Sequence, residues 1–311
     1  MILRDMVWIT ATMFFLSSAI SQAGAAESIS EVEETTTVHK LDGREIMRKV
    51  EGYLRETSDS AFHRMRLSTC RFGVDDNRIT CAERPRVKSI ESISKNYGPT
   101  GLDSRSVNIV LEPADERGIG LLIYNYDDAN RQNESWIYLS ALGRVKRIAS
   151  SNSDDESEAA SVFGSEFTTE DMSTGKLDQY AINLLEESIV RNREVWVIEM
   201  IPNEQRARET RYGRTVSYID KERYVSLRSD YYDHFGDAIK RLMSSKIELL
   251  DDIWMARSLT MMNLVTNRLS NMAFVEVYTG IDVDDEILSQ RTLTDVAFRE
   301  ARLQAIRAQI D

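Results

Sequence analysis

The chain of 311 residues contains only three histidines and two cysteines, which limits metal and nucleophile chemistry. Four prolines and 14 glycines are too few for a collagen-like or linker-dominated architecture. Positive charge is also scarce, because 39 Lys and Arg stand against 51 Asp and Glu and give a formal net charge of -12. Nucleic-acid binding depends on a basic surface, so this acidic balance argues against DNA or RNA as a partner.

What the sequence does have at its start is one short apolar run. Arg4 precedes the run from Met6 to Ile20, and the small residues Ala23-Gly24-Ala25 follow it. This order is typical of a secretory signal, and the run is shorter than the roughly 20 residues of a membrane span. We therefore expect residues 1–25 to be a signal peptide cleaved near Ala25, rather than an uncleaved anchor. A lipid-anchored form is not indicated, because no cysteine lies near this site.

Export to an oxidising compartment favours a disulfide between the only two cysteines, Cys70 and Cys81. Both lie in partly alternating, strand-like segments that turn-forming residues separate. A hairpin centred between Asp75 and Asp76 places Cys70 directly opposite Cys81, within disulfide reach. A reactive or metal-binding pair is the alternative, but the Cys-x-x-Cys spacing and a nearby second pair of ligands are lacking. We predict the disulfide.

The rest of the chain consists mostly of short strand-like segments between polar turns. Residues 26–40 are acidic and Thr-rich, which predicts a flexible N-terminus of the mature chain. Residues 42–54 carry apolar side chains at helical spacing, and so do Val296, Leu303, Ile306 and Ile310. Between these two helical patterns we predict strands at 62–72, 79–90, 105–112, 119–126, 135–140, 144–149, 179–188, 194–201, 211–219, 224–232, 238–249, 257–265 and 271–279.

These segments and their short connections predict one antiparallel meander. The strand pattern continues on both sides of the polar stretch 150–158, which we interpret as an exposed loop rather than a linker. We therefore expect a single domain over residues 41–311.

A sheet of this length must bury an apolar face, and one solution closes it fully or partly around a cavity, with helices over the open side. Flexible methionines beside aromatic residues suit a cavity for irregular acyl chains. Packing into an ordinary core is the alternative for each such residue. The candidates for lipid binding are Trp136, Tyr138, Phe163, Phe167, Trp196, Trp254, Met261, Met262 and Phe274.

Two central stretches are similar to a known family. Ser135-Trp-Ile-Tyr-Leu-Ser-Ala-Leu-Gly-Arg-Val-Lys-Arg-Ile148 is followed by Val162-Phe-Gly-Ser-Glu-Phe-Thr-Thr-Glu-Asp-Met172. With weaker matches that extend from about residue 60 to residue 280, they resemble the LolA-like family of outer-membrane lipoprotein-sorting proteins. Ser140 stands where the family often has Pro, and Glu166 stands where it usually has Asp. These departures bear on cargo and partner contacts rather than on the fold.

The resemblance implies a mainly β (α+β) fold, an unclosed antiparallel β-barrel of about eleven strands covered by helices, with a hydrophobic cavity beneath them. It also implies a periplasmic carrier or chaperone for a lipid or lipoprotein acyl chain, serving an RND-type membrane exporter. A non-transporting envelope sensor or regulatory binding module on the same fold is the alternative. We expect the carrier, because such regulators usually have a second domain.

Small and charged residues in the two motifs have structural interpretations of their own. Gly143 and Gly164 permit turn geometries that are closed to other residues. Thr168 or Thr169 is expected to cap a short helix, in which the next two residues complement the positive end of the helix dipole.

The charged residues of the two motifs are expected to pair with each other. Arg144 and Arg147 lie on a predicted strand, and Glu170 and Asp171 lie in the expected helix. We favour ion pairs between these groups over contact of the arginines with an anionic headgroup.

Catalysis is not indicated. Asp230-Tyr-Tyr-Asp-His234 is the best metal candidate, but on a strand it offers at most two ligands on one face. Gly-x-Ser-x-Gly, His-Glu-x-x-His and Gly-rich phosphate loops do not occur in the sequence. We expect a binding protein, not an enzyme, with no metal and no cofactor.

Overall fold

The computed structural model describes residues 41–56, 59–76, 78–98, 101–148, 161–172 and 176–310. They belong to one compact unit, Leu41–Asp311. The predicted signal peptide, the segment 26–40 and the polar stretch 150–158 lie outside the described residues. None of the helices within the described residues has the length and apolar character needed to cross a bilayer.

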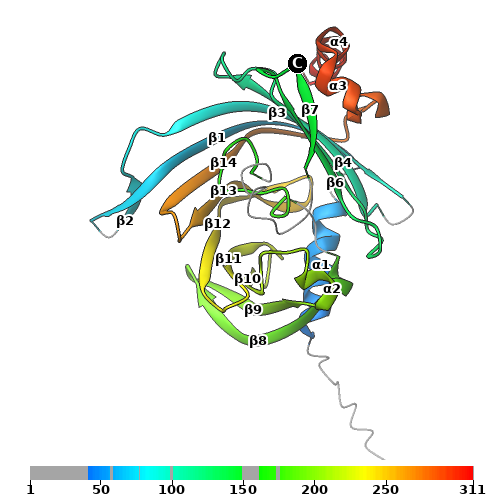
Figure 1. The fold of residues 1–311 in the computed structure, drawn as a ribbon. Coiled ribbons are helices and arrows are strands. Elements are labelled where there is room, and N and C mark those ends of the chain that lie inside the picture. Colours follow the sequence, from blue (N-terminus) through cyan, green and yellow to red (C-terminus); the bar gives the residue numbers. More distant parts are fainter. Residues whose placement is uncertain are drawn as a thin grey trace, which may run out of the picture. The chain divides into compact units, whose positions relative to one another are not determined.

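One antiparallel sheet of fourteen strands dominates these residues (Figure 1). Its strands are β1 (Ser60–Asp75), β2 (Arg78–Cys81), β3 (Arg86–Tyr97), β4 (Asp103–Glu112), β5 (Gly120–Asn125), β6 (Glu134–Leu139), β7 (Arg144–Ile148), β8 (Tyr180–Val190), β9 (Arg193–Pro202), β10 (Arg214–Asp220), β11 (Ser226–Tyr232), β12 (Ala238–Leu250), β13 (Ile253–Asn263) and β14 (Arg268–Thr279). The strands are ordered β7-β6-β5-β4-β3-β1-β14-β13-β12-β11-β10-β9-β8, and β2 pairs with β1 alone. The first and last strands therefore lie side by side in the middle of the sheet.

The predicted fold class is confirmed, because the sheet is antiparallel throughout and its two ends, β7 and β8, do not pair within the described residues. Each predicted strand segment corresponds to an observed strand, except that 79–90 contains both β2 and β3. Residues 82–85 separate these two strands, and Pro85, which has no backbone N–H to donate to a ladder, ends the break. The sheet has more strands than the about eleven that the family resemblance implies.

Helix α1 (Gly43–Glu56) lies against the inner face of the curved sheet (Figure 1). The predicted apolar spacing is observed, because Ile46 and Val50 are buried against Ile198 of β9 and Ile219 of β10. The short helix α2 (Glu204–Ala207) and the 3-10 turn η2 (Leu177–Gln179) flank the same end of the sheet. This packing covers the inner face of β8 to β10.

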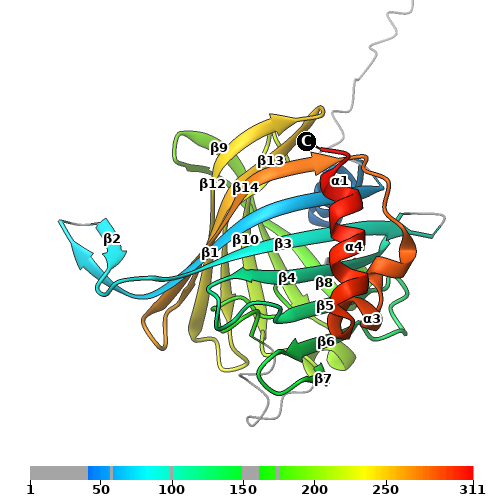
Figure 2. The same cartoon turned by 90° about the horizontal axis from the view of Figure 1, so that it is seen from above.

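The C-terminal elements cover the outer face of the other end (Figure 2). They are η3 (Asp285–Leu288), α3 (Gln290–Thr294) and α4 (Val296–Arg307). Leu303 and Ile306 are buried in a cluster with Phe62 and Leu122 of the sheet, as their spacing predicts. The same prediction is wrong for Val296, which is 55% exposed. Asp295 caps α4, and the first residue after this cap faces solvent.

The segment Ser161–Met172, which we call the plug, fills part of the hollow of the sheet. Its apolar residues Val162, Phe163 and Phe167 are buried in a cluster with Met65 of β1 and Met261 of β13. Well-packed interiors leave few voids larger than a water molecule. The inner face around Met261 is therefore a filled core and not an open cavity.

The predicted disulfide Cys70–Cys81 is present, with a Cα–Cα separation of 5.7 Å. The predicted register is wrong, because Cys81 pairs with Phe72 and Asp75 pairs with Arg78. The turn therefore follows Asp75 instead of being centred on the 75–76 bond, and Cys70 lies diagonally across from Cys81. Cys70 directly follows the last β1 residue that pairs with β3, at the point where β2 takes over as the partner of β1.

Removing this disulfide, as in the double variant Cys70→Ser/Cys81→Ser, should lower the free energy of unfolding by about 3 kcal/mol. The reason is that the bond closes a loop with a sequence separation of 11 and restricts the unfolded chain. Urea denaturation of both proteins measures the difference. Equal stability, or a free-thiol count in the native protein that reductant does not change, would contradict the prediction.

Candidate functional site

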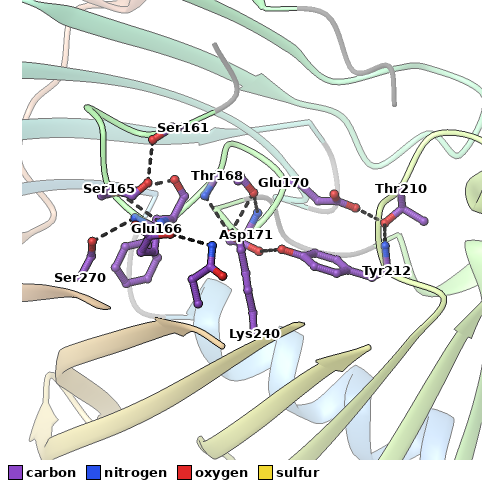
Figure 3. Close-up of polar contacts among 12 residues, drawn as sticks. Ser161, Ser165, Glu166, Thr168, Glu170, Asp171, Thr210, Tyr212, Lys240 and Ser270 are labelled. Carbon is purple, nitrogen blue, oxygen red and sulfur yellow. Dashed lines mark hydrogen bonds and ion pairs between the residues drawn. The ribbon is translucent and has the colours of Figure 1, made fainter. Parts of the chain in front are cut away.

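The plug is held in place by hydrogen bonds to strands on the far side of the hollow (Figure 3). The backbone N–H of Glu166 donates to Ser270 Oγ at 2.9 Å. The Glu166 carboxylate accepts from Asn263 Nδ2 at 2.9 Å and from Arg268 Nε at 3.0 Å. Within the plug, Ser161 Oγ donates to the carbonyl of Ser165 at 2.6 Å. Glu166, where the resemblance departs from Asp, therefore links the plug to the β13–β14 hairpin.

The two motif glycines both occupy the left-handed region of backbone space. Gly164 has φ +73° in the plug, and Gly143 has φ +59° in the β6–β7 turn. A side chain is disfavoured at such angles. Phe163 also has a positive φ of +53°, which is uncommon for a large residue. The Phe163 ring is buried in the core. The Phe163 carbonyl accepts a hydrogen bond from Lys88 Nζ at 2.7 Å.

The expected short helix at Thr168 is wrong: residues 169–172 form a hydrogen-bonded turn. The reciprocal contacts of a helix cap are nevertheless present. The backbone N–H of Asp171 donates to Thr168 Oγ1 at 3.3 Å, and the backbone N–H of Thr168 donates to Asp171 Oδ2 at 2.8 Å. Within the described residues, the end of the second motif is therefore a turn with cap-like hydrogen bonds and not a helix.

The carboxylate of Asp171 is buried and that of Glu170 is half-buried, and each has several partners (Figure 3). Asp171 accepts from Tyr212 Oη at 2.7 Å and from Lys240 Nζ at 3.0 Å. Glu170 accepts from Thr210 Oγ1 and pairs with Arg206. Burial raises the pKa of Glu170 in spite of Arg206, and burial together with Asp171 raises the pKa of Tyr212 well above its ordinary value.

The predicted ion pairs between the two motifs are therefore wrong. Arg147 pairs with Glu134 on the neighbouring strand β6, at 2.9 Å, and Arg144 is exposed. The partners of Glu170 and Asp171 are instead Arg206 and Lys240, which lie far along the chain. Sequence proximity could not indicate Arg206 and Lys240 as partners, because the plug crosses the hollow and contacts elements that are distant in the sequence.

Next to this network lies a cavity of about 640 Å³. This cavity is lined by residues of α1, the ends of β5 to β7, the plug, η2 and β9 to β11. Its apolar wall consists of Met47, Val50, Ile123, Ile148, Met172, Leu177, Met200 and Tyr231, and its charged lining residues are Glu51, Arg131, Glu134, Glu170, Asp171, Lys176, Arg206, Glu209 and Arg211. The cavity therefore offers apolar and charged surfaces to one ligand.

None of the nine residues predicted to bind lipid lines this cavity. Trp136 and Tyr138 pack against the C-terminal helices, on the outer face. Four of the nine belong to the filled core around the plug: Phe163, Phe167, Met261 and Phe274. Trp196 packs on the α1 cluster, Trp254 lies under the Arg223 guanidinium, and Met262 is buried elsewhere on β13.

The residues that do line the cavity include three methionines that our selection missed. Met47 lies on the predicted N-terminal helix, and Met172 ends the second motif. Met200 lies on β9. The methionines predicted to bind lipid, Met261 and Met262, therefore differ from those that line this cavity. Met47 and Met172 were marked by a helical pattern and by a family motif, respectively.

In the acidic Asp230 stretch, the side chains of Asp230 and His234 form contacts within the sheet and with the connection before β10. Asp230 is buried and accepts from Arg228 and Arg241. His234 contacts the backbone carbonyl of Thr210 at 2.9 Å. Over the described part of the chain, no group of three or more His, Cys, Asp or Glu residues could hold a metal ion.

Comparison with known proteins shows the family to which the chain belongs. A family model described as "-like: Uncharacterized protein" matches residues 102–295, which is more than half of the chain, so the chain belongs to that family. No curated protein matches it. Its fold is LolA-like, as the following solved structures show.

A DUF1329 family protein from Desulfovibrio piger shares 23% identity and a TM-score of 0.70 with this chain, over 81% of this chain and 97% of that one. A putative outer membrane lipoprotein-sorting protein domain from Vibrio parahaemolyticus shares 23% identity and a TM-score of 0.69, over 81% and 98%. A LolA superfamily protein from Nitrosomonas europaea shares 15% identity and a TM-score of 0.58, over 80% and 98%.

Lys240→Met should destabilise the protein by about 3–5 kcal/mol, because it leaves the carboxylate of Asp171 buried without its cation. The double variant Asp171→Asn/Lys240→Met should recover much of this loss, since the buried charge is gone. Urea denaturation of both single variants and the double variant measures the coupling. A double variant whose loss equals the sum of the two single losses would show that the pair does not anchor the plug.

Proposed function

We propose that this chain is an exported, periplasmic carrier or chaperone that binds an acyl chain of a lipid or lipoprotein in the cavity beside α1. The observation that carries the proposal is that both apolar and charged residues line this cavity. An acyl chain attached to a polar group needs an apolar wall that continues into polar surface, and the cavity has both within about 640 Å³. This volume falls in the range of roughly 300–1,000 Å³ that is typical of small-molecule sites.

The apolar wall suits a flexible chain. Met47, Met172 and Met200 come from a helix, the plug and a strand, so three separate elements supply the methionines. An unbranched thioether side chain adapts to irregular shapes, and such walls accept ligands that differ in length and unsaturation. A rigid aromatic wall would select one ligand shape more strictly.

The cavity also borders the filled core. Ile123, Ile148 and Met172 line the cavity and at the same time pack in the cluster that contains Phe163 and Phe167. A chain longer than the cavity would extend by displacing the plug aromatics, which would bring the predicted residues Met261 and Phe274 into contact with it. The predicted lipid-binding role of these four residues thus depends on movement of the plug.

The comparisons support the carrier class. One neighbour of this fold is described as a putative outer membrane lipoprotein-sorting protein domain, and another as a LolA superfamily protein. On this proposal, the protein is exported and its signal peptide is cleaved near Ala25. It then crosses the periplasm with its cargo and exchanges that cargo with an RND-type exporter.

The test is to replace Met200 by Trp in the secreted protein and to compare it with Met255→Trp. Both methionines are half-buried on strands, but only Met200 lines the cavity. We expect the wild-type protein and Met255→Trp to yield bound lipid in an organic extract, and Met200→Trp to yield at least fivefold less at unchanged thermal stability. Mass spectrometry of the extracts, with an unrelated exported protein as background, measures the yield.

Two results would contradict the proposal: wild-type extracts without lipid above background, or equal loss in both variants. Transfer of a labelled lipid between donor and acceptor vesicles then separates a carrier from a sensor. A carrier accelerates the transfer, whereas a sensor binds lipid and leaves the transfer rate unchanged.

A further inference from the structure

The cations that line the cavity differ in how they are compensated. Arg206 pairs with Glu170 and Glu209, at the edge of the plug network. Lys176 and Arg211 line the same cavity, and neither has a carboxylate within ion-pair distance among the residues that the structure describes. Within the described residues, the positive charge of Lys176 and Arg211 is therefore not neutralised by direct contact with a carboxylate.

Four of the carboxylates that line the cavity, in contrast, have cationic partners. Glu134 pairs with Arg147, and Asp171 pairs with Lys240. Glu170 and Glu209 share Arg206. At these four carboxylates, a cationic headgroup would have to displace an existing ion pair, whereas an anionic headgroup would supply a partner that Lys176 and Arg211 lack among the described residues.

Of these two cations, Lys176 is the stronger candidate for contact with an anion, because it is only 9% exposed. Its ammonium donates to the backbone carbonyl of Arg131, next to the bond from Gln179 Nε2 to the carbonyl of Ala129. Burial lowers the pKa of Lys176, although Asp128 and Glu209 act on it in the opposite direction from beyond ion-pair distance. An ammonium has three donors, and burying one without a counter-ion is costly.

Lys176 also borders a second hollow, of about 730 Å³, which Arg44 and Arg48 of α1 line together with Leu102 and Asp127. The side chain therefore stands at the boundary between two adjoining spaces, one of which contains the methionine wall. A headgroup at Lys176 would lie beside the acyl-chain wall and within reach of the second space.

We propose that the cavity selects amphiphiles with an anionic headgroup, a phosphate monoester or a carboxylate, and that Lys176 binds this group with Arg211 beside it at the cavity wall. This inference rests on the proposed function and assigns the ligand class to the same cavity.

The experiment compares three single-chain probes of equal acyl length: oleate, oleoyl lysophosphatidate and neutral monoolein. Delipidated full-length mature protein is titrated with each by calorimetry. We expect the two anionic probes to bind at least tenfold more tightly than monoolein, and inorganic phosphate to bind at least a hundredfold more weakly than lysophosphatidate.

The variants Lys176→Met and Arg211→Gln test the assignment, with Arg208→Gln as the control from the same connection but outside the cavity wall. Lys176→Met should weaken the anionic probes about tenfold and leave monoolein unchanged. Arg211→Gln, at an exposed position that does not threaten folding, should weaken them about threefold, and Arg208→Gln should have no effect. A purely structural role of Lys176 would weaken all three amphiphiles equally.

Each other outcome has a definite meaning. Equal binding of monoolein and the anionic probes overturns the headgroup assignment and leaves the carrier proposal standing. Binding of none of the three amphiphiles overturns the carrier proposal, and the inference with it. Phosphate that binds as tightly as lysophosphatidate would show an anion site without an acyl-chain site, which also overturns the inference.

Discussion

The constraint on which the structure depends is the apolar inner face of one wide antiparallel sheet that does not close. A sheet of this width leaves an inner surface that must be removed from water, and burial of apolar surface is the largest favourable contribution to folding. Helix α1 covers one end, at Ile198 and Ile219, and the plug covers the other with Phe163 and Phe167. The cavity is the space that remains between these two covers, so its position follows from the way the face is buried.

This arrangement places buried charge beside the cavity. The plug must be held against the sheet, and Asp171 and Glu166 do so through Lys240 and Arg268. Isolated buried charges are costly, and paired ones are tolerated when hydrogen bonds satisfy them. The motif that carries the family resemblance is therefore explained by folding, because its aromatic residues fill the hollow and its acids anchor it. The motif residues that line the cavity are its last members, Thr168 to Met172.

The sequence predicted the strands well, because alternation and turn residues are local signals. It predicted the disulfide but not its register, since a shift of the turn leaves the cysteines diagonal to each other and still within reach. The residues that line the cavity were not predicted from the sequence. Phe167 and Met261 have the residue types of a lipid-binding wall, but only the path of the plug decides that they face each other. Likewise, Lys240 and Asp171 lie 69 positions apart, and no local pattern connects them.

The most direct test of the account is to locate a bound chain on the protein. A palmitate that carries a photoactivatable diazirine near its methyl end is bound to the mature protein, irradiated and mapped by mass spectrometry of the peptides. The account predicts labels on the peptides that contain Met47, Met172 and Met200, the three methionines of the cavity wall. Labels confined to the outer-face residues Trp136 and Tyr138 would contradict it, because the chain would then bind beneath the C-terminal helices.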